Sequence, residues 1–196
     1  MAMPVITALR PIETVYRGYR FRSRLEARWA VFFQTLGVPW EYEPQGYKLS
    51  DGRWSLADFR VKLADHVLWA EVKPGGIADD GRFYRFLEDL GDQGETWLTT
   101  RGTWLHEIPD PDDVAAERPH GPDGYDFRIF GDIFYQFCVC STCNAVGFEF
   151  EGRSARIECG CRLPTSGRDH THDHPRILNA YAAARAARFG HGESGD

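Results

Sequence analysis

The stretch Trp54-Ser-Leu-Ala-Asp-Phe-Arg-Val-Lys-Leu-Ala-Asp-His-Val-Leu-Trp-Ala-Glu-Val-Lys73 decides the fold. It predicts a first strand over about Trp54–Leu63 and a second over about Val67–Lys73, with a short turn at 64–66 between them. A Pro-Gly-Gly sequence then ends the second strand. Two strands joined by so short a turn are expected to pair as a hairpin.

The alternation of side chains along the second strand predicts a site on one face of this hairpin. Glu71 and Lys73 share one face, and the alternate positions point into a core (Leu68, Ala70 and Val72). Hairpin pairing brings Asp58 to the face of Glu71 and Lys73. Two carboxylates suit a hard cation such as Mg²⁺ (or Mn²⁺), and an adjacent amine can orient or deprotonate a water. The plainer alternative is a solvated strand face with an ordinary salt bridge.

Length and composition set the class of protein. A chain of 196 residues with a formal net charge of −6 predicts one medium domain, or one domain with a small appendage. No apolar run approaches the ~20 residues needed to span a bilayer, and the first ten residues lack the features of a signal peptide. We therefore expect a cytoplasmic protein without membrane partners. No glycine-rich phosphate-cradling loop is present, so no nucleotide cofactor is expected.

A basic stretch lies near the N-terminus. Four arginines alternate there with Tyr16, Tyr19 and Phe21, and they are candidates for nucleic-acid binding: Arg17, Arg20, Arg22 and Arg24. The alternative is a solvated helix face with a lead-in strand.

A helix is expected to begin inside this stretch. Ser23 is a good N-cap, Glu26 follows three residues later, and Gly37 ends the segment. An apolar face recurs at helical spacing: Leu25, Trp29, Phe32, Phe33 and Leu36. Glu26 has two interpretations, as the partner of Ser23 in a capping box or as a carboxylate at the edge of the metal site.

The pattern Asp58…Glu71-x-Lys73 resembles the PD-(D/E)XK nuclease superfamily, although Ala57 stands where the family usually has proline. The segments 16–30 and 37–44 are similar to the front of its phage-associated or transposition-type branch. The resemblance covers roughly 16–104. It implies a restriction-endonuclease-like mixed sheet flanked by helices, in the order helix, three strands, helix, strand. It further implies catalytic Asp58, Glu71, Lys73 and Glu26, with Asp58, Glu71 and Glu26 as Mg²⁺ ligands.

All five cysteines fall in one window. Cys140-x-x-Cys143 and Cys159-x-Cys161 form two pairs, and the spacer between them alternates like a β-hairpin. This spacing predicts a Cys₄ zinc ribbon, structural because four thiolates leave no open position. Free buried or disulfide-bonded cysteines are the alternative. Whether Cys138 or the histidines of 170–174 bind metal stays open.

The remaining elements complete the expected division of the chain. A strand is expected over 95–100, with a turn at Arg101-Gly102, and a last helix from Pro175 to about Phe189, capped by Asp173 or His174. The predicted parts are a nuclease core at 1–109, a loop at 110–124, a strand region and zinc ribbon at 125–163, and a linker with the C-terminal helix at 164–196.

The function expected from these features is a Mg²⁺-dependent nuclease, a metal-dependent hydrolase of DNA phosphodiester bonds. One alternative is a catalytically silent adaptor with a nuclease-like fold that binds nucleic acid or protein. Another is a nuclease subunit active only within a larger nucleoprotein complex.

Overall fold

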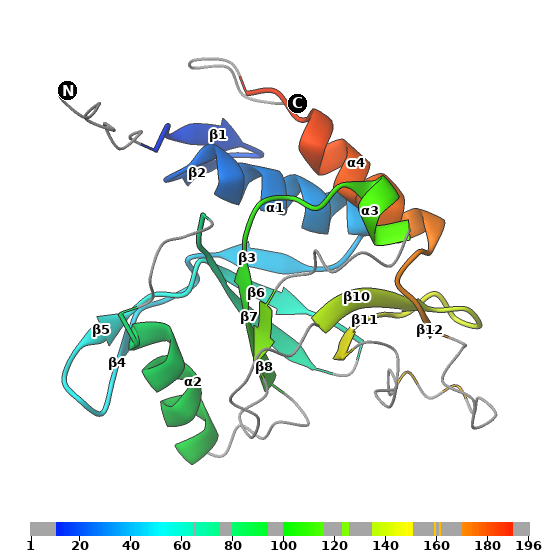
Figure 1. The fold of residues 1–196 in the computed structure, drawn as a ribbon. Helices are drawn as coiled ribbons and strands as arrows, with labels where there is room; N and C mark the ends of the chain where they lie inside the picture. Colours follow the sequence, from blue (N-terminus) through cyan, green and yellow to red (C-terminus); the bar gives the residue numbers. More distant parts are fainter. Residues whose placement is uncertain are drawn as a thin grey trace, which may run out of the picture.

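The computed structural model describes residues 11–64, 66–74, 80–93, 100–115, 123–125, 135–150, 159, 161 and 170–189. Within these ranges the fold is mixed α/β, with a five-stranded mixed sheet at its centre (Figure 1). In spatial order its strands are β3 (Trp40–Tyr42), β6 (Phe59–Lys62), β7 (Val67–Val72), β8 (Thr100–Leu105) and β9 (Asp123–Tyr125). β7 and β8 are parallel, and the other neighbours are antiparallel.

Smaller elements surround this sheet. Two short ribbons pair β1 (Thr14–Tyr16) with β2 (Tyr19–Phe21) and β4 (Tyr47–Lys48) with β5 (Trp54–Ser55). A three-stranded sheet has the spatial order β11 (Val146–Phe150), β10 (Tyr135–Cys140), β12 (His170–Thr171). The described helices are α1 (Arg24–Leu36), α2 (Arg82–Asp92), α3 (Pro111–Ala115) and α4 (Pro175–Ala186). None of them is long and apolar enough to cross a membrane.

Helix α1 has the ends that the sequence predicts. The Ser23 hydroxyl accepts a hydrogen bond from the Glu26 N–H, and Gly37 ends the helix in the left-handed region at φ 71°. A glycine adopts this conformation without the strain that a Cβ would cause. The predicted apolar face is buried: Trp29, Phe32, Phe33 and Leu36 are each at most 1% exposed.

The β6–β7 hairpin places a different helix on each face of the sheet. Phe59 pairs with Ala70, and Leu68, Ala70 and Val72 pack into the core that contains α1 and α4. Trp69, on the opposite face, packs against α2 through Phe86. Figure 1 shows the same arrangement, with α1 and α4 on one side of the sheet and α2 on the other.

The expected strand over Trp54–Leu63 is divided. β5 pairs with β4 in its own ribbon, whereas β6 starts at Phe59 and pairs with β3 and β7. Between them the chain passes from one sheet to the other, and the Asp58 carbonyl accepts a hydrogen bond from the Glu43 N–H. The prediction of one continuous strand was therefore wrong, because the partner of each half is set by tertiary contacts.

The strand after α2 also differs from the prediction. β8 runs over Thr100–Leu105 and passes through Arg101-Gly102, where a turn was expected; residues 94–99 lie outside the described part. A Cβ at Gly102 would lie 2.2 Å from Cδ1 of Leu87 on α2. The glycine therefore allows close approach of the helix rather than a turn.

The C-terminal elements pack on α1. The ring of Phe32 lies 4.5 Å from that of Tyr181 on α4, and Phe137 and Phe148 face one another in paired strands β10 and β11. The second arm of the hairpin expected in the cysteine spacer lies at 151–158, outside the described residues. Helix α4 begins at Pro175 behind His174, as predicted, but ends at Ala186. The range 110–124, expected to be a loop, contains α3 and the start of β9.

Candidate metal sites

Asp58 and Glu71 meet at the start of the β6–β7 hairpin. Because Phe59 pairs with Ala70, continuing the register by one residue places Asp58 opposite Glu71, and opposite residues share a face. Asp58 is 2% exposed, and its Oδ2 accepts a hydrogen bond from the Val72 N–H at 2.7 Å. Asp58 lies just before β6, where the backbone pairing with β7 ends. Its side chain there accepts the hydrogen bond from the Val72 N–H of β7.

The electrostatic balance at Asp58 favours a cation. Burial, the charge of Glu71 and, more weakly, that of Glu26 raise the pKa of Asp58 to about 7, against the opposing effects of the Val72 N–H and Arg22. The shift reflects carboxylates brought together away from water. A bound divalent cation would favour the ionised form and reverse the shift.

Lys73 completes the predicted group. Its Nζ lies 3.2 Å from Oε1 of Glu71, and the two side chains are 20% and 18% exposed. Its backbone is held by the neighbouring strand: the Lys73 N–H donates to the Leu105 carbonyl at 2.9 Å, and the Lys73 carbonyl lies 2.7 Å from Nδ1 of His106. Sequence reasoning did not find His106, because its place beside Lys73 depends on the parallel pairing of β7 and β8.

A cavity of about 320 Å³ lies beside these groups. Glu71 and Arg22 line it together with Trp54 of β5 and Arg82 and Phe83 at the start of α2. The space therefore reaches the carboxylate face of the hairpin, and its lining combines two arginines with two acids, Glu71 and Asp80.

Arg22 points toward the acids. Its guanidinium contacts the Asp58 carboxylate, and its Nε lies 2.9 Å from Oε1 of Glu43. The sequence predicts Arg22 as a nucleic-acid contact, but in the structure it is a cation placed against the candidate ligand Asp58. The sequence shows that Arg22 carries a charge. It does not show that the side chain points toward Asp58, because Asp58 lies 36 positions away.

The other three arginines of the basic stretch have separate surroundings. Arg20 lies 3.4 Å from Glu13 on the surface, and Arg17 occupies the β1–β2 turn with φ 49°. Arg24 starts α1, and its Nη2 lies 3.4 Å from the Phe189 carbonyl. The structure thus does not gather the four predicted arginines into one group.

Glu26 makes the contacts of a helix cap. Its carboxylate accepts hydrogen bonds from the Ser23 hydroxyl (2.9 Å), the Arg22 N–H (3.0 Å) and the Tyr42 hydroxyl (2.5 Å). Burial and this bond to Glu26 raise the pKa of Tyr42 well above its usual range. A metal role for Glu26 stays a prediction, and it would require an exchange of these hydrogen bonds.

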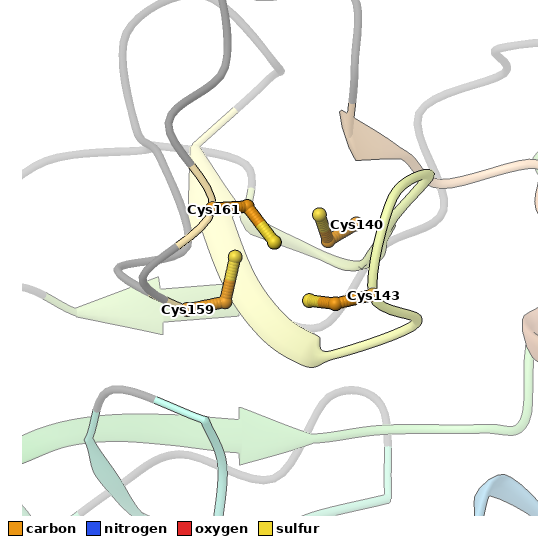
Figure 2. Close-up of side chains that lie close together, drawn as sticks. All are labelled: Cys140, Cys143, Cys159 and Cys161. Atoms are coloured by element: carbon orange, nitrogen blue, oxygen red, sulfur yellow. The ribbon is translucent and has the colours of Figure 1, made fainter.

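The second candidate site is formed by four thiols. One Sγ from each of Cys140, Cys143, Cys159 and Cys161 lies within 4.8 Å of the others (Figure 2). Among the described residues, this is the one group of three or more potential His, Cys, Asp or Glu ligands that lie so close together. The four cysteines form no disulfide in the described structure, and neither does buried Cys138, which is not part of the group.

The local backbone explains the first pair of cysteines. Cys140 ends β10, and Cys143 lies in the turn that follows. The Cys140 N–H donates to the Ala145 carbonyl at 2.9 Å, and the Asn144 N–H donates to the Cys140 carbonyl at 2.9 Å. Asn144 adopts φ 59°, a left-handed conformation that asparagine tolerates better than most residues. The tight turn presents the Cys140 and Cys143 thiols to the same point.

The thiols influence one another's ionisation. The Ala145 N–H and the Cys161 thiol lower the pKa of Cys143 to about 7, whereas hydrogen bonds with Cys143 and Cys159 raise the pKa of Cys161 to about 12. Four thiols at this spacing could hold a metal ion, and the donor set is compatible with structural zinc.

Comparison with known proteins identifies no relative: no protein-family model, no curated protein and no solved structure matches the chain.

Proposed function

We propose that this protein is a Mg²⁺-dependent nuclease that hydrolyses DNA phosphodiester bonds. The observation that carries the proposal is the position of buried Asp58 opposite Glu71, with the Lys73 ammonium 3.2 Å from Glu71. The order of elements, α1 followed by β3, β6 and β7, then α2 and β8, supports a restriction-endonuclease-like core.

In this proposal Asp58 and Glu71 hold the cation, which supplies Lewis acidity and a more acidic water when bound. Lys73 orients the attacking water and stabilises negative charge that develops on the phosphate. The attacking water gives up a proton to solvent and its oxygen forms a bond to phosphorus as the bond to the leaving oxygen breaks, and the leaving oxygen takes up a proton from solvent. The cavity beside Glu71 provides room for the phosphate.

The four thiols serve a structural role in this proposal. A zinc ion held by Cys140, Cys143, Cys159 and Cys161 has no free coordination position, so it fixes the chain instead of reacting. Arg176 of α4 supports this interpretation, since its guanidinium donates to the Asn144 carbonyl at 2.6 Å and to the Leu36 carbonyl at 2.8 Å. The cysteine turn is thereby attached to the end of α1.

One observation favours a second function, a DNA- or protein-binding adaptor without turnover. Arg22 contacts Asp58, so a cation of the chain itself lies at a position that a metal would need. If this contact persists when divalent cations are present, the fold is used for binding alone. A subunit that cleaves only inside a larger complex is the intermediate case.

The test is cleavage of plasmid, linear and branched DNA in Mg²⁺ or Mn²⁺ by wild type, Lys73→Ala and Lys62→Ala. Lys62 is the matched control, because it is an exposed lysine on the same hairpin. We expect Lys73→Ala to lose at least about 100-fold in rate, the usual contribution of a positioned proton-transfer group, and Lys62→Ala to cleave like wild type. Equal cleavage by all three would end the catalytic assignment. Cleavage that requires an added partner would support the subunit interpretation.

A further inference from the structure

Four arginines gather where α1 and α4 lie side by side (Figure 1). Arg24 and Arg28 are one helical turn apart on α1, and Arg185 and Arg188 lie at the C-terminal end of α4. Arg24 reaches the Phe189 carbonyl, which follows Arg188 directly. Burial and the charges of the other three arginines lower the pKa of Arg28, so the four guanidinium groups are close enough to repel one another.

The positive charge of this group is poorly matched. Within the described ranges, the acid that pairs with it is Asp110, which lies 2.9 Å from Arg185. The Nε atoms of Arg24 and Arg28 are buried and have no hydrogen-bond acceptor, and Arg28 makes no hydrogen bond or ion pair in the described structure. A buried donor without an acceptor is unfavourable, and these two together call for an acceptor that the described residues do not supply.

Helix capping explains only half of the group. Nη1 of Arg188 donates to the carbonyls of residues 185, 186 and 187 at the C-terminal end of α4, where cations are favourable. Arg185 lies in the last turn of α4 and donates to the Ile108 carbonyl outside the helix. Arg24 and Arg28 belong instead to the N-terminal half of α1, where a cation is unfavourable. Arg24 has one structural partner, the Phe189 carbonyl, whereas the Arg28 side chain has none among the described residues.

We propose that Arg24, Arg28, Arg185 and Arg188 form a binding site for the phosphate backbone of a nucleic acid. Guanidinium groups bind phosphate oxygens through paired N–H donors, and the site supplies such donors from two helices. The site is positive on a chain whose net charge is −6, so the charge is a local feature.

A repeating polyanion fits better than a single anion. The β1–β2 ribbon adjoins the same end of the molecule, since the Tyr16 ring lies 6.2 Å from that of Phe189. Exposed Arg17, next to Tyr16 in the turn of this ribbon, adds positive charge at this end, whereas Arg20 is paired with Glu13. The inference holds whether the chain cleaves nucleic acid or only binds it.

The site lies away from the candidate carboxylates. Glu26 is two residues from both Arg24 and Arg28, which places it on the opposite side of a helix about 10 Å wide. Bound backbone would therefore contact this site some distance from any bond cleaved at Asp58 and Glu71, so binding and cleavage are separable by mutation.

The experiment measures binding of a labelled short DNA duplex and of its single strand by fluorescence anisotropy, without added Mg²⁺. The full chain is compared with Arg24→Ala/Arg28→Ala and with the matched control Arg60→Ala/Arg85→Ala, which removes two exposed arginines from β6 and α2. We expect the first double variant to bind about tenfold or more weakly. Between about 50 and 200 mM salt, its log–log salt slope should be smaller by about 2. The control pair should bind like wild type.

Folding is checked separately. The Arg28 side chain has no hydrogen-bond or ion-pair partner among the described residues, so Arg28→Gln should melt no lower than wild type and still weaken DNA binding. Equal binding by the two double variants would overturn the proposal. Binding of polyglutamate with no binding of either DNA would also overturn it, and would indicate an acidic protein segment as the ligand.

Discussion

The carboxylate site on β6–β7 and the four-thiol site after β10 both gather metal-binding groups, but their partners within the chain differ. At the first site Asp58 contacts Arg22 and the Val72 N–H, Glu71 pairs with Lys73, and Glu26 accepts a hydrogen bond from Tyr42. At the second site the thiols lie within hydrogen-bonding range of one another. A metal at the thiols displaces protons, whereas a metal at the carboxylates has to displace Arg22 as well.

This difference predicts different roles for a metal bound at each site. A metal bound by four thiols would link the turn after β10 to Cys159 and Cys161, so its binding free energy would contribute directly to folding. A metal at Asp58 competes with charges that already stabilise the fold, so its binding depends on pH and on substrate. Four measurements test this contrast between the thiol site and the carboxylate site, in order of decreasing effect.

The largest effect is expected from Cys140→Ser. This variant removes one of four ligands, and we expect zinc content to fall from about one ion per chain to near zero. The melting temperature should fall by roughly 10 °C, equivalent to ~3 kcal/mol for a chain of this size. Elemental analysis and thermal melting measure the two outcomes. Cys138→Ser is the matched control, because Cys138 is a buried cysteine on the same strand that does not join the group. Full zinc content in Cys140→Ser would remove the thiol site from the account.

A smaller effect is expected from Arg22→Ala. Without the guanidinium, a divalent cation no longer meets a like charge beside Asp58, so Mn²⁺ affinity should rise by about tenfold above pH 8. Calorimetric titration measures the change. Arg60→Ala is the control, since Arg60 pairs with the exposed carboxylate of Glu41 and not with Asp58. Unchanged or weaker Mn²⁺ binding in Arg22→Ala would show that Arg22 does not compete with the metal.

The raised pKa of Asp58 predicts a pH dependence of stability in metal-free buffer. A carboxyl with a folded pKa of about 7 and an unfolded pKa of about 4 holds a proton in the folded chain that the unfolded chain has lost. Its stabilising contribution is complete below about pH 4 and is lost as the pH rises through 7. Relative to Asp58→Asn, wild type should lose roughly 5 °C in melting temperature from pH 5 to pH 8. If the melting temperatures of the two proteins change with pH in parallel, the pKa of Asp58 is not raised in the folded chain.

The smallest effect concerns the attachment of the thiol site to α1. Arg176→Ala removes the hydrogen bonds to the Leu36 and Asn144 carbonyls and should destabilise the fold by about 1–2 kcal/mol. Zinc content should be retained, because Arg176 contributes no ligand. Chemical denaturation measures the loss. A variant as stable as wild type would mean that α1 and the cysteine turn are held together by apolar packing alone.

The features that the sequence predicts correctly are local ones. Ser23 and Gly37 mark the ends of α1 because a cap and a left-handed glycine act on adjacent backbone, and the alternation in Val67–Val72 marks β7. The convergence of the four thiols follows from paired spacing. Each of these depends on residues that are close in the chain.

The features that the sequence does not predict depend on distant partners. Gly102 resembles a turn residue until Leu87 of α2 is seen to pack against it. The division between β5 and β6 depends on which sheet each half joins, and the direction of Arg22 depends on Asp58. The arginine group of α1 and α4 joins residues more than 150 positions apart, so no local pattern could indicate it.

A crystal of the protein soaked in Mn²⁺ tests most directly whether Asp58 and Glu71 bind a divalent cation, with anomalous scattering used to locate the ion. We expect Mn²⁺ bound to both Asp58 and Glu71, with Arg22 moved away from Asp58. Mn²⁺ absent from both carboxyl groups, with Arg22 still in contact with Asp58, would contradict this expectation.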